Sequence, residues 1–151
     1  MGGDAAAAEG GGLSRIPLRT VPAYRAARYA VWFRDETISL SVGTTVPRRV
    51  GAWLGAAMAA VFVTPCAPRG RPRRPGVERA SFRRFRARVV AARIAHLEGE
   101  GGDHAGQWPS EPSLLVRLKH PSHAAGWGRA LDQNAVLLVQ RRGAVRLLLL
   151  R

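Results

Sequence analysis

The clearest alternation of hydrophobic and polar positions lies between Tyr29 and Val42. There YAVWF is followed by three charged residues and then by TISLSV, in which apolar and hydroxyl side chains alternate. Alternation among β-branched and aromatic residues is typical of strands with one buried face. The pattern therefore predicts a β-hairpin over residues 29–42.

A second apolar run, VGAWLGAAMAAVFV at residues 50–63, contains no charged residue. As a helix it would be about 21 Å long, shorter than the roughly 30 Å hydrocarbon core of a bilayer. The run predicts a short buried or interfacial helix. Gly51, Gly55 and Ala59 recur at intervals of four within it, a spacing that would let a second helix approach closely.

Residues 79–97 are compatible with a helix that carries Phe82, Phe85 and Val89 on one side. At about 100° per residue, the apolar residues beyond Val89 fall in a different sector, and arginines separate the two. The pattern predicts a helix, but it does not indicate a clean basic amphipathic helix for a membrane or a partner.

The sequence between residues 98 and 113, EGEGGDHAGQWPSEPS, carries four acids, four glycines and two prolines. This composition is typical of a linker, which we expect to be disordered. Three apolar runs follow it, SLLVRL, AVLLVQ and AVRLLLL, and the last two predict a hairpin. The low-complexity residues 1–12 predict a flexible tail, and we expect both termini to be disordered.

The fold class predicted from these elements is α+β, small and loosely organised, with substantial disordered or irregular segments. Leu, Ile, Val and Phe supply 36 of the 151 residues, only slightly more than the level below which disorder is expected. The expected organisation is a tail at 1–12, a hairpin and apolar helix at 13–64, a basic segment and helix at 65–97, a linker at 98–113, and a strand-rich segment at 114–151.

The net charge of +14 comes from 23 arginines and a single lysine. Charge alone does not explain this ratio, because both residues neutralise phosphate. Gly, Ala, Arg and Pro, whose codons are GC-rich, make up 75 of the 151 residues. One reading is therefore that the chain is the product of a GC-rich reading frame with no evolved biochemical function.

Positive charge is concentrated in residues 69–93, which hold ten arginines and one acid, Glu78. Just before and within this stretch, PRGRPRRP at residues 68–75 resembles the AT-hook, a short motif of chromatin and architectural DNA-binding proteins. Gly70 would let the backbone approach the floor of a narrow minor groove while the flanking guanidinium groups enter it. The resemblance implies a DNA-binding site formed by Arg69, Gly70, Arg71, Pro72, Arg73 and Arg74. No family is suggested for the whole chain.

The leading hypothesis is weak, non-enzymatic, A·T-preferring DNA binding, with DNA or another polyanion as partner and a nuclear location. An alternative is a membrane-associated protein that uses residues 50–63, with flanking arginines favouring an anionic lipid surface. Residues 13–34 contain five arginines and no acid, as in an organelle transit peptide.

Other chemistry finds little support in the sequence. Cys66 is the only cysteine, so an intramolecular disulfide is impossible and a disulfide-stapled secreted protein is not expected. The four histidines, His96, His104, His120 and His123, lack the supporting ligands of a zinc site. We therefore expect no catalytic residue, metal, cofactor or small-molecule ligand.

Overall fold

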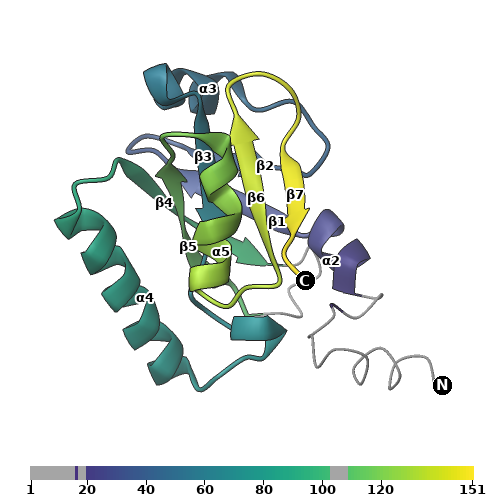
Figure 1. The fold of residues 1–151 in the computed structure, drawn as a ribbon, viewed down its shortest axis with the longest axis vertical. Helices are drawn as coiled ribbons and strands as arrows, with labels where there is room; N and C mark the ends of the chain where they lie inside the picture. The colour runs from purple at the N-terminus through teal and green to yellow at the C-terminus, as the bar shows by residue number, and fades with distance from the viewer. Residues whose placement is uncertain (1–15, 17–19, 103–108) are drawn as a thin grey trace.

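A computed structural model of the chain describes residue 16, residues 20–102 and residues 109–151 (Figure 1). Seven strands form one antiparallel sheet in the order β2-β1-β4-β5-β3-β6-β7. The strands are β1 (Arg28–Trp32), β2 (Thr37–Leu40), β3 (Ala59–Val63), β4 (His96–Gly102), β5 (Glu111–Arg117), β6 (Ala135–Gln140) and β7 (Arg146–Leu149). The helices are α2 (Thr20–Ala26), α3 (Arg48–Leu54), α4 (Pro75–Ala91) and α5 (Ala124–Ala130), with 3₁₀ turns η1 (Gly55–Ala57), η2 (Pro68–Gly70) and η3 (Pro121–His123).

The class is thus α+β, but the described chain is more ordered than the loosely organised one that the sequence predicts. The hairpin predicted at residues 29–42 is present as β1 and β2, with Tyr29 opposite Leu40 and Trp32 opposite Thr37. The C-terminal hairpin is present as β6 and β7. The expectation of a disordered C-terminus is therefore wrong, whereas the predicted tail at 1–12 lies outside the described residues.

The helix predicted at residues 50–63 is wrong in its second half. Helix α3 ends at Leu54, a 3₁₀ turn follows, and residues 59–63 form β3 near the centre of the sheet, between β5 and β6. The spacing of Gly51, Gly55 and Ala59 therefore marks no helix-packing face. Gly55, with φ +56°, ends α3.

Strand β3 is apolar throughout because the sheet is covered on both sides. All five of its residues are buried. Val61 and Val63 pack with Phe82 and Phe85 of α4, whereas Phe62 packs on the opposite side with residues of α3 and β1. A strand covered on both faces needs no polar alternation, so its pattern resembles that of a buried helix.

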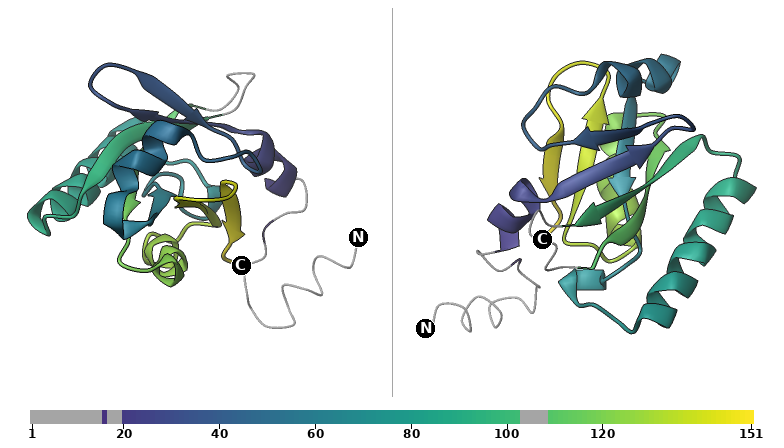
Figure 2. Two further views of the ribbon diagram at one scale, coloured as in Figure 1. Left: turned by 90° about the horizontal axis from the view of Figure 1, so that it is seen from above. Right: turned by 180° about the vertical axis from the view of Figure 1, so that it is seen from behind.

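The sheet curls, and the β1–β2 hairpin and the β6–β7 hairpin lie on two sides of α3 (Figure 2, left). Val50 and Leu54 of α3 fill this concave side, and both are fully buried. Helices α4 and α5 cover the other side. No described helix is long and apolar enough to cross a bilayer.

Helix α4 lies on the outside of the molecule and contributes one face to the core (Figure 2, right). Its buried residues are Phe82, Phe85 and Val89, the three that the sequence predicts. Pro75 occupies the first turn, where its fixed φ and missing N–H cost nothing. The helix ends at Ala91, earlier than predicted, so Ile94 and Leu97 belong to the turn and the next strand, whereas Val90 is exposed on the helix.

The linker predicted at residues 98–113 is wrong at both ends. Residues 98–102 complete β4 and residues 111–113 begin β5, and these two strands pair with each other. Gly99 has a structural reason for its place in β4, since a Cβ there would come within 2.0 Å of the Ala30 carbonyl oxygen on β1. The close approach of β1 and β4, absent from any local signal, explains this glycine.

Candidate functional site

The segment predicted to bind DNA is folded into a turn. Arg69 and Gly70 both have positive φ, +58° and +74°. The Gly70 N–H donates to the Ala67 carbonyl at 2.8 Å, and the Arg69 N–H donates to the Asp132 carbonyl at 2.8 Å. An extended arm lying along the floor of a groove is therefore not the conformation of these residues.

Two of the predicted arginines are held by carboxylates of the protein. Arg69 pairs with Asp132 at 3.0 Å, and Arg73 pairs with Glu78 at 2.6 Å. Glu78 also accepts from the backbone N–H groups of Ala67 and Arg73, at 2.8 and 3.1 Å. Although burial acts to raise it, these hydrogen bonds and the Arg73 guanidinium hold the pKa of the Glu78 carboxyl below its ordinary value.

Seven of the ten arginines in residues 69–93 have no ion pair among the described residues. All seven are exposed. We call them the basic surface; they are Arg71, Arg74, Arg79, Arg83, Arg84, Arg88 and Arg93. Of the predicted DNA-binding residues, the basic surface retains only Arg71 and Arg74.

The arginines of α4 lie on its solvent side in two rows. At about 100° per residue, Ala87 lies opposite the buried side of the helix. Arg79 and Arg83 fall to one side of it, and Arg84 and Arg88 fall to the other. The helix therefore presents small residues at the centre of its outer face and guanidinium groups along both edges.

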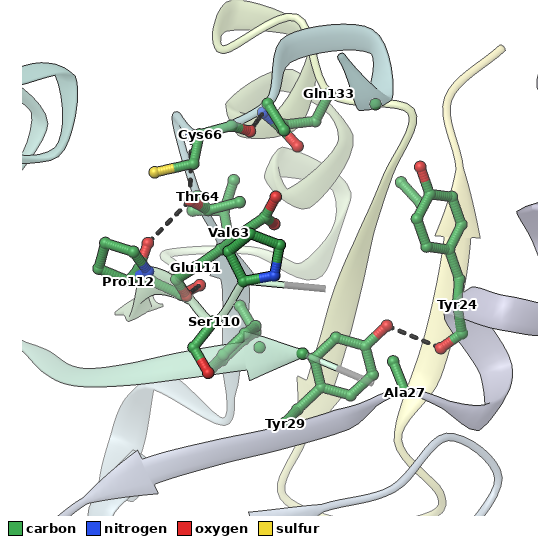
Figure 3. Close-up of a pocket in the computed structure, with 18 of the residues that line it drawn as sticks. Tyr24, Ala27, Tyr29, Val63, Thr64, Cys66, Ser110, Glu111, Pro112 and Gln133 are labelled. Carbon is green, nitrogen blue, oxygen red and sulfur yellow. Dashed lines mark hydrogen bonds between the residues drawn. The ribbon is translucent and has the colours of Figure 1, made fainter. Parts of the chain in front are cut away.

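A cavity of about 560 Å³ lies between α2, β1, the stretch after β3 and the start of β5 (Figure 3). This volume is in the range that encloses a small molecule. Figure 3 shows Tyr24 and Tyr29 on one side of the cavity, with Thr64, Cys66 and Glu111 on the other. Gly70, Pro72 and Arg73, which the sequence assigned to DNA, also line it.

Glu111 is the exceptional side chain in this cavity. It is half-buried, and within the described part of the chain its carboxylate has no ion pair and no hydrogen bond. Burial, with a smaller effect from the Glu78 carboxylate, raises the pKa of Glu111 to about 7. The carboxyl group therefore changes charge near neutral pH.

Three other polar side chains of the cavity wall donate hydrogen bonds to backbone carbonyls of the wall. The Tyr29 hydroxyl donates to the Tyr24 carbonyl at 2.7 Å, and Thr64 donates to the Pro112 carbonyl at 2.8 Å. Gln133 donates to the Cys66 carbonyl at 2.9 Å. Burial raises the pKa of the Tyr24 and Tyr29 hydroxyls and of the Cys66 thiol, so all three stay protonated at neutral pH.

The sequence did not reveal this cavity, because its residues come from segments far apart in the chain. Glu111 stood inside a predicted linker, where nothing distinguished it from the neighbouring acids. Its position opposite Gly101 on β4 is a consequence of strand pairing. Among the described residues, no three His, Cys, Asp or Glu side chains are grouped as a metal site would require.

Taken together, the fold and these two features define an α+β protein with a curled antiparallel sheet, an arginine-rich outer helix and a partly open cavity. Residues 63–136 match the model of a family described as "Protein of unknown function (DUF3293)". The match covers just under half of the chain, from the end of β3 to the start of β6. No curated protein and no solved structure matches the chain.

The match corrects the resemblance drawn from the sequence. The family model runs through residues 68–75, and no AT-hook or other architectural DNA-binding family is found. The reason is physical as well: Arg-Gly-Arg-Pro here closes a 3₁₀ turn whose first arginine pairs with Asp132. The assignment of residues 68–75 to an AT-hook is wrong.

Proposed function

We propose that the protein binds duplex DNA, without catalysis, through the basic surface along α4. The observation that carries this proposal is the set of seven exposed arginines, on and beside one helix, for which the described residues supply no carboxylate. Exposed guanidinium groups that are not committed to internal pairs are free to displace counterions from phosphates. Arginine also makes bidentate contacts with phosphate oxygens.

The arrangement of the arginines suits a helix that lies in a groove. The major groove of B-DNA is about 12 Å wide and admits an α-helix. With Ala87 directed at the groove floor, Arg79 and Arg83 would face one phosphate strand, and Arg84 and Arg88 would face the other. Alanine offers no hydrogen bond to base edges, so these contacts position the protein and do not select a sequence.

The proposal departs from the sequence hypothesis in one respect. An A·T preference requires arginines inserted into a narrow minor groove, and the folded turn at Gly70 provides no such arm. We therefore expect similar affinity for A·T-rich and G·C-rich duplexes of equal length.

The membrane alternative receives less support from the packing. Within residues 50–63, the side chains of Val50, Leu54, Val61 and Phe62 lie in the core. The apolar side of α4 is likewise covered by the sheet. Insertion into a bilayer would require these side chains to leave the core, whereas phosphate binding uses groups that are already exposed.

Fluorescence anisotropy with labelled duplexes at ~50 and ~200 mM salt tests the proposal. If four arginines of α4 each neutralise one phosphate, log affinity falls with log salt with a slope of about −3.6, which is roughly a 100-fold loss over this range. The triple variant Arg83→Ala, Arg84→Ala, Arg88→Ala should reduce the slope to about −1.

The matched control removes the same charge elsewhere, with Arg34→Ala, Arg48→Ala and Arg142→Ala, three exposed arginines outside the basic surface. The control variant should keep the steep slope, since these positions lie in the β1–β2 turn, α3 and the β6–β7 turn. An equal loss in both variants would show that net charge alone binds DNA. Absence of binding by the wild-type protein at low salt would favour the view that its basicity reflects GC-rich coding.

A further inference from the structure

We infer that the cavity beside β5 binds a small cationic ligand, a protonated amine carried on an apolar body, with the Glu111 carboxylate as its counter-ion. This inference does not depend on the proposed DNA-binding surface, with which the cavity shares one residue, Arg79. The family match, which covers Glu111 and much of the cavity wall, assigns no ligand to this site.

The unpaired carboxylate is the first support. A charged group that is partly desolvated is ordinarily paired or hydrogen-bonded, because partial burial without a partner costs free energy. Glu111 has neither among the described residues, although it lines a space large enough for a ligand. A cationic ligand would supply the missing partner.

The cations nearest to this space are not engaged with Glu111. Arg73 also lines the cavity, but its guanidinium donates to Glu78 and to the Pro65 carbonyl, at 2.6 and 3.1 Å. Arg79 lines the cavity and makes no ion pair with Glu111. The carboxylate is therefore available to a cation that enters from outside.

The walls indicate what the cation would be attached to. The cavity is lined mostly by apolar side chains, among them Phe62, Val63, Leu137 and Leu147. The rings of Tyr29 and Phe62 meet edge to face at 5.6 Å between centroids. Aromatic rings stabilise apolar groups and nearby cations alike, so an arylalkyl or alkyl amine fits the surface better than a bare metal ion.

The space beside Glu111 favours a cation over an anion. Two carboxylates, Glu111 and Glu78, and two guanidinium groups, Arg73 and Arg79, contribute to the lining of the cavity, and Arg73 is paired with Glu78. The Glu111 carboxylate is close enough to act on the Tyr24 and Tyr29 hydroxyls, and it contributes to the raised pKa of each. A negatively charged ligand placed here would be repelled by the Glu111 carboxylate, whereas a positively charged ligand would be attracted to it.

The ligand should bind more tightly as Glu111 ionises. The titratable and charged groups around the cavity are Tyr24 of α2, Tyr29 of β1, Cys66 after β3, Arg73 before α4, and Glu78 and Arg79 of α4. Burial keeps the tyrosines and the cysteine protonated, and Glu78 is already ionised, so Glu111 is the group of this set that titrates near pH 7. Amine binding should therefore release a proton when it occurs below that pH.

Isothermal titration calorimetry of the full chain provides the test. The probes are three amines, tryptamine, benzylamine and cyclohexylmethylamine, with tryptophol and indole-3-acetate as neutral and anionic counterparts of tryptamine. We expect at least one amine to bind at millimolar or lower concentration, and its affinity should fall about 8-fold from pH 8.5 to pH 5.5, because protonated Glu111 keeps only the affinity expected of a neutral side chain. At pH 8.5 it should exceed the affinity for its neutral counterpart by roughly 10-fold or more.

The variant Glu111→Gln keeps the shape of the side chain and removes its charge. It should lose about 10-fold in amine affinity at pH 8.5 and lose the pH dependence, while its affinity for tryptophol changes less than about twofold. The matched control is Glu100→Gln on β4, which removes a nearby charge that does not line the cavity and should retain amine binding.

Because an altered fold would also abolish binding, circular dichroism and the thermal midpoint of each variant accompany the titrations. Three outcomes would overturn the inference: no amine binding by the wild-type protein, tighter binding of indole-3-acetate than of tryptamine, or an unchanged pH dependence in a folded Glu111→Gln protein. None of these outcomes bears on the DNA titrations, whose triple variant replaces Arg83, Arg84 and Arg88, none of which lines the cavity.

Discussion

The basic surface of α4 and the cavity beside β5 both contain charges without partners, but in opposite settings. On and beside α4, seven arginines are exposed to water and make no ion pair among the described residues. In the cavity, the Glu111 carboxylate is half-buried and has no ion pair or hydrogen bond among the described residues. The first region has excess positive charge in solvent, and the second holds, beside the Arg73–Glu78 pair, one carboxylate without such a pair in a largely apolar surrounding.

The two regions differ in how much an unpaired charge costs the stability of the folded protein. An exposed guanidinium is well solvated, so leaving it unpaired costs little and a GC-rich gene could supply many of them. A carboxylate in an apolar cavity lowers stability unless it is protonated or paired. The partly buried Glu111 carboxylate is therefore stronger physical evidence for a ligand than the seven exposed arginines are for DNA, even though the arginines dominate the composition.

The largest expected effect comes from the acid that lies between the two regions. Glu78→Ala removes the acceptor for Arg73 and for two backbone N–H groups, at Ala67 and Arg73. We expect a loss of about 3 kcal/mol in the free energy of unfolding, because a largely buried, hydrogen-bonded charge is deleted. Urea denaturation at neutral pH measures this loss. A change below about 0.5 kcal/mol would mean that the turn at residues 68–70 is held by other contacts.

A smaller effect of opposite sign is expected for the acid that has no partner. The pKa of Glu111 rises from its ordinary 4.5 to about 7 in the folded protein. The native state therefore binds more protons than the unfolded state between these values, so stability falls as pH rises through this window and the full cost is present above it. Glu111→Gln should stabilise the protein by about 2 kcal/mol at pH 9 and change little at pH 4.

Urea denaturation of wild-type and Glu111→Gln proteins across this pH range checks the prediction, with Glu100→Gln as the control. The difference between wild type and Glu111→Gln should open between pH 5 and pH 8 in particular. If the two proteins lost stability in parallel as pH rises, the carboxylate would be solvated in the folded state, and the contrast between the two regions would disappear.

The smallest expected effect is on the stability of the arginine variant. Replacing Arg83, Arg84 and Arg88 with alanine should change the free energy of unfolding by less than about 0.5 kcal/mol, since exposed unpaired charges contribute little and alanine favours helix. Thermal denaturation measures this directly. A large destabilisation would show that these side chains pack against the protein, and their role in DNA binding would then need a different explanation.

Local signals in the sequence carried a good part of the fold. The alternation over residues 29–42 and the turn between AVLLVQ and AVRLLLL indicated two hairpins, which the structure contains. The spacing of Phe82, Phe85 and Val89 indicated the buried side of α4. Each of these signals depends on neighbours close in sequence, so no knowledge of the sheet order was needed.

The failures arose where distant segments decide local structure. The run at residues 50–63 has the same apolar character in a helix as in a strand covered on both faces, and its division into α3 and β3 depends on pairing with β5 and β6. The glycine-rich stretch at 98–102 was predicted to be part of a linker. It is instead strand, and Gly99 allows the backbone of β1 to lie close to β4. Glycine is found both in flexible segments and where another strand packs closely. Only the position of that other strand in the fold distinguishes the two cases.

What the sequence determined by itself was the α+β class, the two hairpins, the buried side of α4 and the concentration of arginine in residues 69–93. The tertiary structure alone decided that Arg69 and Arg73 are paired with carboxylates, that seven other arginines are exposed on and beside α4, and that Glu111 lines a cavity with no ion pair among the described residues. The physical reason is the separation in sequence over which each interaction acts. Hydrophobic periodicity acts between near neighbours in the chain, whereas ion pairing and desolvation depend on which distant segments the sheet brings together.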